Sequence, residues 1–278
     1  MKTSIFQSFF APISISDFKS EYFNKKVLHL LGNKERTLGF SEEQFFNCLA
    51  DCENVRAVFK GLLQARIAPN DAKQMVAAGA TICASGVENT NLKLKEFLDA
   101  LKIELCFTGY ISIRAYYSPP GNGFDKHYDP RIVTTLQIEG SKTWYYCPVP
   151  FDQLPMINSP MPIPISYEEH LDKYGTIKCT LEPGNILCLP AGVIHWAEAG
   201  KTNSLSMNIA FDYIGDTIAD KIASKVKNML LKNVEFRNAP FLPLSDEHTK
   251  NIKDAISDSI SYLENIYNNT NNLYDYDG

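Results

Sequence analysis

The feature that most constrains the fold is a run of short alternating segments between residues 109 and 212. Apolar residues there either alternate with polar ones or fill brief blocks, which is typical of β-strands. The strand-like segments are TGYISIRAYYS, RIVTTLQIEG, KTWYYCPV, GTIKCTLE, NILCLPAG, VIHWAEA and SLSMNIAFD. Pro and Gly turns separate them at residues 119–121, 140–141, 183–184 and 191–192. Many short strands with turns between them predict a sandwich or barrel.

The flanking regions have a helical period instead. Residues 15–106 are expected to be mainly helical, with Ser41 and Gln44 forming a capping box before FFNCLADC. Within that stretch, residues 81–85 predict a short strand and residues 92–101 an amphipathic helix. After residue 217, IADKIASKVKNMLLKN and HTKNIKDAISDSISYLENIY predict two amphipathic helices. We therefore expect residues 1–212 to form one domain (helical lead-in 15–106, β core 107–212) and residues 213–278 a helical appendage.

Composition narrows the partners and the compartment. The net charge is -5, and such a surface repels phosphate backbones, so nucleic acid is not expected as a primary partner. Seven cysteines occur without a CxxC pair, which favours reduced thiols over disulfides or structural zinc. No apolar run approaches the roughly 18 residues that span a bilayer, and the N-terminal apolar stretch is too broken for a signal peptide. A cytoplasmic protein without a membrane partner is expected.

The chemistry is concentrated in His127-Tyr128-Asp129 and in His195. In a strand, residues two apart point to the same face, so His127 and Asp129 can reach one ion while Tyr128 points away. The HYD motif follows a Pro-Pro-Gly turn and a GNGF segment that is expected to be flexible, and His195 follows a second Pro/Gly turn. Two imidazoles and one carboxylate leave open positions on an octahedral ion, as non-heme iron(II) oxygenases require for a chelating co-substrate and dioxygen.

The other histidines serve as a comparison. His29 lies in an apolar VLHLL run that is expected to be helical, His170 follows two glutamates, and His248 lies in a polar helix start. None has a carboxylate two residues away on a strand, so packing or surface roles are expected for all three.

The residues around these ligands resemble a known family. IRAYYSPPGNGFDKHYDPRIVTTLQIEGSKTWYYCPVP and LEPGNILCLPAGVIHWAEA are similar to the JmjC-like cupin oxygenases of the ribosomal-oxygenase type, which hydroxylate protein side chains. The resemblance covers roughly residues 15–212. It implies a double-stranded β-helix, the jelly roll of the cupins, as a mainly β core with flanking helices.

The resemblance also implies which residues hold the co-substrate 2-oxoglutarate. By motif, Lys142 and Tyr116 correspond to the residues that bind its distal carboxylate, and Asn208 is expected to face the same pocket. A buried ammonium paired with a carboxylate would form a charge-assisted hydrogen bond. The alternatives are a solvated turn for Lys142 and core packing for Tyr116, with Tyr117 adjacent.

One position departs from the family pattern. Arg114 stands two residues before Tyr116, where the family usually has asparagine. Its guanidinium could bind a carboxylate of substrate or co-substrate, or it could point outward. This departure leaves the substrate open.

These observations predict an iron(II)- and 2-oxoglutarate-dependent oxygenase that uses O2 to hydroxylate an unactivated C–H bond. Asp129 favours hydroxylation, since a small residue there would leave room for halide. The resemblance implies an amino-acid side chain of a protein or peptide as the substrate; a free amino acid or small metabolite is the alternative. A metal-binding cupin without catalysis is the other reading. The apolar faces of the C-terminal helices predict burial, either in a homodimer or against the barrel of the same chain.

Overall fold

The protein was analysed as a computed structural model, which describes residues 4–59, 61, 63–160, 164–232, 237 and 246–268. The chain divides into two compact units, Met1–Asp212 and Tyr213–Gly278. The first unit contains every strand of the described residues and the predicted site. The second contains two helices.

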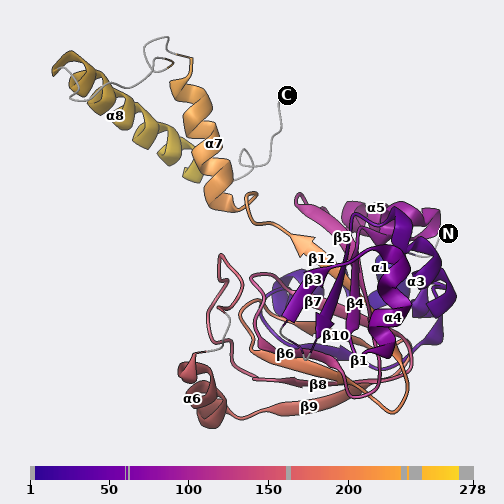
Figure 1. Ribbon diagram of the computed structural model, residues 1–278. Coiled ribbons are helices and arrows are strands. Elements are labelled where there is room, and N and C mark those ends of the chain that lie inside the picture. The colour runs from indigo at the N-terminus through magenta and orange to yellow at the C-terminus, as the bar shows by residue number, and fades with distance from the viewer. Residues whose placement is uncertain are drawn as a thin grey trace. The chain divides into compact units, whose positions relative to one another are not determined.

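Unit 1 is built on two antiparallel sheets (Figure 1). The large sheet has the strand order β1-β10-β7-β12-β5-β4-β2-β3, and the small sheet has the order β6-β11-β8-β9. The strands of the large sheet are β1 (Leu28–Leu30), β2 (Asn54–Phe59), β3 (Leu63–Arg66), β4 (Thr81–Ser85), β5 (Tyr110–Ser118), β7 (Val133–Glu139), β10 (Ile186–Leu189) and β12 (Ser204–Asp212). Those of the small sheet are β6 (Gly123–His127), β8 (Lys142–Tyr146), β9 (Ile177–Leu181) and β11 (His195–Ala199). Each strand predicted from residues 109–212 is present, and the jelly-roll fold class is confirmed.

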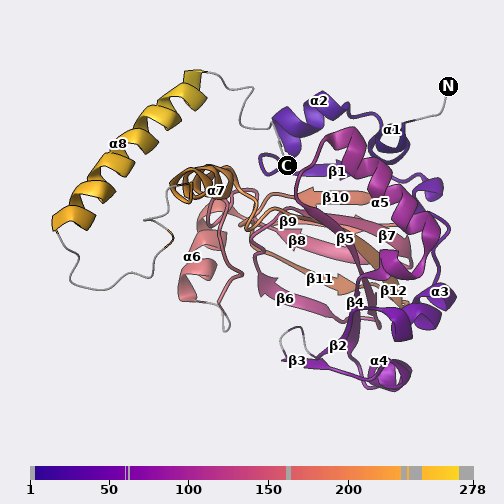
Figure 2. The ribbon, with the colours of Figure 1, turned by 90° about the horizontal axis from the view of Figure 1, so that it is seen from above.

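Helices cover the outer face of the large sheet (Figure 2). The α-helices of unit 1 are α1 (Ile5–Phe10), α2 (Ile15–Asp17), α3 (Glu42–Cys48), α4 (Ala72–Ala77), α5 (Leu92–Leu105) and α6 (Ile165–Tyr174). Shorter turns are the π-helix η1 (Phe18–Tyr22) and the 3-10 helices η2 (Lys34–Thr37), η3 (Leu49–Asp51), η4 (Pro69–Asp71) and η5 (Val87–Thr90). The predicted capping box is confirmed, because Ser41 and Gln44 each accept a hydrogen bond from the other's backbone N–H at the start of α3.

Alternation along the strands separates an apolar face from a polar one. On β5, Ile113, Ala115 and Tyr117 are buried in the core that the sheet shares with α1, α3 and α5. Arg114 and Tyr116 point to the opposite face, where they line a cavity. The cavity is also lined by residues of β6, β8 and β11, so it lies between the inner faces of the two sheets.

The prediction of a mainly helical stretch from residue 15 to 106 is wrong in part. This stretch also contributes β1, β2 and β3, which were not predicted, and β4, which confirms the short strand predicted at residues 81–85. These strands extend the large sheet at both ends. The run around His29 forms β1 and pairs with β10, because a short apolar run fits a strand as well as a helix and the sheet edge is available to it.

The GNGF segment is not a flexible connection, since Gly123 begins β6. A Cβ atom on Gly123 would lie 1.8 Å from the carbonyl oxygen of Ala197 on β11. Glycine is therefore required there because the two backbones approach so closely.

The described residues of unit 2 contain α7 (Ile218–Leu230) and α8 (Asp246–Asn268), which confirms the two predicted helices. A second capping box begins α7, formed by Thr217 and Asp220. The segment between the two helices that contains Pro240 and Pro243 lies outside the described residues. No helix in the part of the chain that the structure describes combines the length and apolarity needed to cross a membrane.

Gly192 offers a test of the turn before β11. It has φ +78°, and a Cβ there would lie 1.7 Å from the carbonyl oxygen of Asp152. We expect Gly192→Ala to lower the free energy of unfolding at least about twice as much as Gly39→Ala does. Gly39 has φ +68° with no atom near its Cβ position, so its substitution adds only the left-handed backbone cost of about 1–2 kcal/mol. Urea denaturation of both variants measures the difference, and equal losses would contradict the steric argument.

Candidate metal centre and its cavity

Two of the predicted metal ligands come from neighbouring strands of the small sheet. His127 is the last residue of β6, and His195 is the first residue of β11. The strands are antiparallel, and their register places His195 opposite His127. Opposed residues of an antiparallel pair share a face, so the two imidazoles lie together.

Asp129 lies two residues beyond the end of β6, so its predicted position within a strand is wrong. The backbone carbonyl of Asp129 accepts a hydrogen bond from Gly192 N at 2.9 Å, which ties it to the turn before β11. Tyr128 points away as predicted, into a buried cluster with Tyr167 and Ile194. The tie to Gly192 and the burial of Tyr128 hold the Asp129 carboxylate toward the histidines without a strand.

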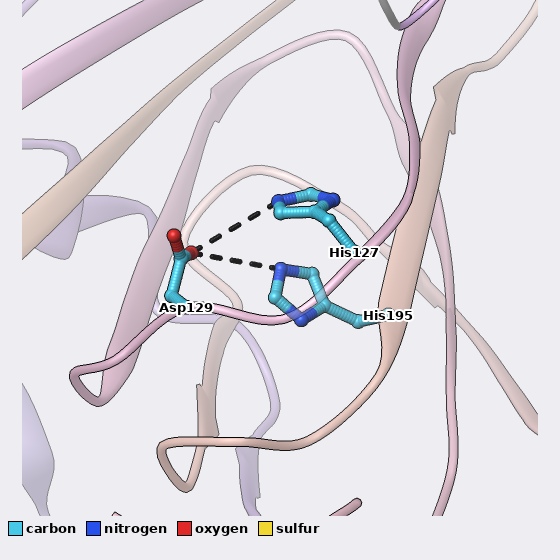
Figure 3. A group of neighbouring side chains, drawn as sticks. All are labelled: His127, Asp129 and His195. Carbon is cyan, nitrogen blue, oxygen red and sulfur yellow. Dashed lines mark ion pairs between the residues drawn. The ribbon is translucent and has the colours of Figure 1, made fainter. Parts of the chain in front are cut away.

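The three side chains converge (Figure 3). Asp129 Oδ2 lies 4.0 Å from His127 Nε2 and 3.8 Å from His195 Nε2. The two imidazole centroids are 4.3 Å apart. Among the described residues, these three form the one group of three or more His, Cys, Asp or Glu side chains arranged to hold a metal ion.

Backbone hydrogen bonds orient both imidazoles. His127 Nδ1 lies 2.6 Å from the carbonyl oxygen of Asp125, and His195 Nδ1 lies 2.8 Å from that of Val193. A carbonyl oxygen can only accept, so each Nδ1 donates and each Nε2 keeps its lone pair. In both residues Nε2 is the nitrogen nearer to Asp129, which leaves it free to bind an ion.

The protonation of His195 suits metal binding. Burial, followed by the neighbouring His127, lowers the pKa of His195 to about 4, so its imidazole is neutral near pH 7. Two imidazoles and one carboxylate are the donor set of the facial triad that binds iron(II) in non-heme oxygenases. The residues present therefore fit a divalent transition metal.

The other histidines lie elsewhere. His29 is exposed on β1. His170 is on α6, with Nε2 3.0 Å from the carbonyl oxygen of Val149. The side chain of His248 lies outside the described residues.

A cavity of about 380 Å³ adjoins the three ligands. This volume is within the range of small-molecule sites, roughly 300–1,000 Å³. All seven side chains predicted for the site line it, namely Arg114, Tyr116, His127, Asp129, Lys142, His195 and Asn208.

Lys142 is a buried cation of this cavity. It is only 3% exposed, and its Nζ donates to Ser118 Oγ at 3.1 Å and to Ser206 Oγ at 3.4 Å. No carboxylate of the described residues lies within ion-pair distance of it. Burial lowers the pKa of Lys142 to about 8. A buried ammonium with only neutral partners is costly, and a carboxylate ligand would relieve that cost.

Tyr116 and Asn208 extend this polar wall. Tyr116 stands opposite Ser206 on β12, and burial raises the pKa of its phenol, which therefore keeps its proton. Tyr117 instead packs in the core against Phe45, which excludes it from the cavity. Asn208 lines the cavity, and its Oδ1 accepts a hydrogen bond from Thr134 N.

Three arginines also line the cavity, namely Arg56, Arg114 and Arg131. Arg114 faces the cavity from β5, so it does not point outward. Arg56 joins it from β2 and is a lining residue that was not predicted. The alternation in NVRAVF could have indicated a strand with Arg56 on the polar face, but the surrounding stretch was expected to be helical.

Comparison with known proteins identifies relatives of the chain. Residues 90–217 match the sequence profile of the JmjC domain. Uncharacterized protein YxbC of Bacillus subtilis (strain 168) is 23% identical over 292 aligned residues, which cover 95% of this chain and 85% of that protein. The bifunctional lysine-specific demethylase and histidyl-hydroxylase NO66 of Aedes aegypti is 38% identical over 117 residues, 40% of this chain. Human ribosomal oxygenase 1 is 28% identical over 179 residues, 62% of this chain.

The chain spans only 16% of the length of the Aedes protein and 27% of that of the human protein. Among solved structures, Escherichia coli ribosomal oxygenase YcfD matches with a TM-score of 0.60 at 15% identity, covering 89% of this chain and 67% of that chain. The same protein in complex with cobalt and 2-oxoglutarate also matches with a TM-score of 0.60. At this identity the structural match supports the jelly-roll fold.

Proposed function

We propose that the chain is a JmjC-type, iron(II)- and 2-oxoglutarate-dependent oxygenase that hydroxylates a side chain of a protein substrate, and the match of residues 90–217 to the JmjC domain supports this. The observation that carries this proposal is the buried Lys142 ammonium, which faces the same cavity as the three converging metal ligands. A cupin that only binds metal has no use for a buried, unpaired cation beside the metal site.

In this proposal, His127, Asp129 and His195 hold iron(II) through two Nε2 atoms and one carboxylate oxygen. The bonds from each Nδ1 to a backbone carbonyl keep both rings in the binding orientation. Asp129 supplies a full ligand charge and occupies the position where a smaller residue would admit halide, which favours hydroxylation over halogen transfer.

Lys142 and Tyr116 bind the distal carboxylate of 2-oxoglutarate. The ammonium donates a charge-assisted hydrogen bond, and the phenol, which keeps its proton, supplies a second donor. The Ser118 and Ser206 hydroxyls hold Lys142 in place. Asn208, on the same strand as Ser206, lines the same wall of the pocket.

When bound, the metal supplies activation of O2, one atom of which enters succinate as 2-oxoglutarate loses CO2 while the other becomes the hydroxyl group on the substrate carbon. The chain's own part is to orient these groups and to exclude water from the space between the sheets.

Support for a protein substrate comes from the relatives that carry the names ribosomal oxygenase and histidyl-hydroxylase. We also propose that the protein acts in the cytoplasm, since all seven of its cysteines are free thiols, as in a reducing compartment.

The first prediction concerns turnover. With iron(II), 2-oxoglutarate and O2, the chain should release succinate even without substrate, and His127→Ala should lower that rate by at least about 100-fold because one ligand is lost. His170→Ala, which removes a histidine outside the site, is the control and should match wild type. Succinate is quantified by mass spectrometry. Equal rates for wild type and His127→Ala would rule out the proposed function.

The second prediction concerns Lys142 and pH. In the free protein its pKa is about 8, so below pH 8 the ammonium is already present and 2-oxoglutarate affinity should be constant. Above pH 8, binding must first restore the proton, and affinity should fall by about tenfold per pH unit. Lys142→Met should bind about 10–100-fold more weakly and lose this pH dependence.

Calorimetry with manganese(II) in place of iron measures both effects. Lys126→Met is the matched control, because Lys126 forms a partly exposed ion pair with Glu168. If Lys142→Met kept wild-type affinity, the proposed co-substrate contact would be wrong.

We further propose that unit 2 pairs with a second copy of the chain. α7 has no buried residue, and Val226 and Leu230 lie along one shallow apolar hollow on it. Light scattering should give twice the chain mass of 31.3 kDa. Val226→Glu should give a monomer, whereas Ser224→Glu, at an exposed position of the same helix, should not. A monomeric wild-type chain would contradict the pairing.

A further inference from the structure

Two arginines in the cavity have no role in the proposed metal or co-substrate binding. We propose that Arg114 and Arg56 bind a carboxylate of the substrate and thereby position the C–H bond that is oxidised. This inference rests on the proposed function and names the chemistry of the substrate, which is an acidic group.

Arg114 faces the cavity from the inner side of the large sheet. It is on β5, two residues from Tyr116 on the same strand face, and stands between Asn208 of β12 and Ser85 of β4. Its side chain is partly buried, and among the described residues no hydrogen bond or ion pair engages its guanidinium. A partly desolvated guanidinium with five donors is a strong site for bidentate binding of a carboxylate.

Arg56 lies on the same inner face, in the row of residues that includes Cys83 and Tyr116. Its Nη1 donates to Gln64 Oε1 at 2.8 Å, and its Nη2 lies 3.6 Å from Cys83 Sγ. Its Nε is buried without a hydrogen-bond partner. These contacts hold the Arg56 side chain in place. No carboxylate of the described residues forms an ion pair with it.

The charge of the cavity leads to the same conclusion. Its lining contains four cations, Arg56, Arg114, Arg131 and Lys142, and one anion, Asp129. Arg131 is paired with Asp212 at 3.0 Å. A divalent metal and the dianion of 2-oxoglutarate would cancel each other, and Asp129 offsets one further cation. Two positive charges then remain, which attract an acidic substrate and repel a cationic one.

The co-substrate does not account for these arginines. 2-Oxoglutarate has two carboxylates, and in the proposed function one chelates the metal while the other meets Lys142. Lys142 is hydrogen-bonded to Ser118 and Ser206. Arg114 and its cross-strand partner Asn208 lie two residues further along β5 and β12 than the pair of Tyr116 and Ser206. The substrate is the remaining source of an anion.

The test measures binding to a catalytically inert complex. The chain is loaded with manganese(II) and N-oxalylglycine, a 2-oxoglutarate analogue that is not decarboxylated. Calorimetry then compares acetyl-Ala-Xaa-Ala-amide probes, in which Xaa is Asp, Glu, Asn, Gln or Arg. We expect an acidic probe to bind at least about tenfold more tightly than its isosteric amide, and the Arg probe to bind most weakly.

Arg114→Gln and Arg56→Gln should each reduce this preference to about twofold or less, with N-oxalylglycine affinity unchanged. Arg66→Gln is the matched control. Arg66 stands opposite Arg56 in the register of β2 and β3, but it does not line the cavity. Free L-aspartate and L-glutamate form a second arm. If the free amino acids bind more tightly than the peptides, the substrate that carries the carboxylate is a small acid. If the peptides bind more tightly, it is a polypeptide.

The proposal is overturned if wild type shows no preference for acidic probes, or binds none of them at millimolar concentration. It is also overturned if Arg114→Gln weakens N-oxalylglycine binding and leaves the probe preference intact, since Arg114 would then serve the co-substrate. A wild-type chain that fails to bind N-oxalylglycine with manganese(II) would instead contradict the proposed function itself.

Discussion

The pairing of β11 with its two neighbours is the constraint on which the site depends. On one side its register sets His195 opposite His127, and on the other it sets Ala199 opposite Lys142. A shift of one residue would turn His195 to the outer face of the small sheet. The close approach of β6 and β11 at Gly123 and the Gly192 turn fix this register, so two glycines determine where the histidines lie.

The two faces of the large sheet have opposite roles. Its outer face is covered by α1, α3 and α5 and forms the main apolar core, whereas its inner face presents hydroxyls, amides and cations to the cavity. Arg56 and Arg114 on this face, and Lys142 on the small sheet opposite, are expensive in the cavity, because a desolvated charge without a partner costs several kcal/mol (order of magnitude). The large core on the other face offsets that cost. Such unbalanced charge is what a site for anionic ligands requires, and it stabilises nothing in the free protein.

Much of the site could be predicted because its chemistry lies in short contiguous segments. His127 and Asp129 are two residues apart, and Lys142 and Tyr116 are in motifs that carry the family resemblance. Arg56 could not be predicted in the same way. Its strand lies in a region where short apolar runs fit helix and strand equally well, and only pairing with β4 brings it to the cavity. The strand β1 was missed for the same reason, since its partner β10 is about 160 residues away along the chain.

The jelly-roll class came from the resemblance to the family. The sequence pattern by itself determined the strands after residue 109 except β6, the amphipathic helices at the C-terminal end and the three side chains able to hold a metal. These depend on local periodicity, turn residues and donor chemistry, which are properties of neighbouring residues. Only the tertiary structure decided that Asp129 acts from beyond a strand, that Arg114 faces inward, and that Arg56 joins it. Those outcomes depend on which distant backbones pair and on which face a neighbouring sheet buries, and long-range packing sets both.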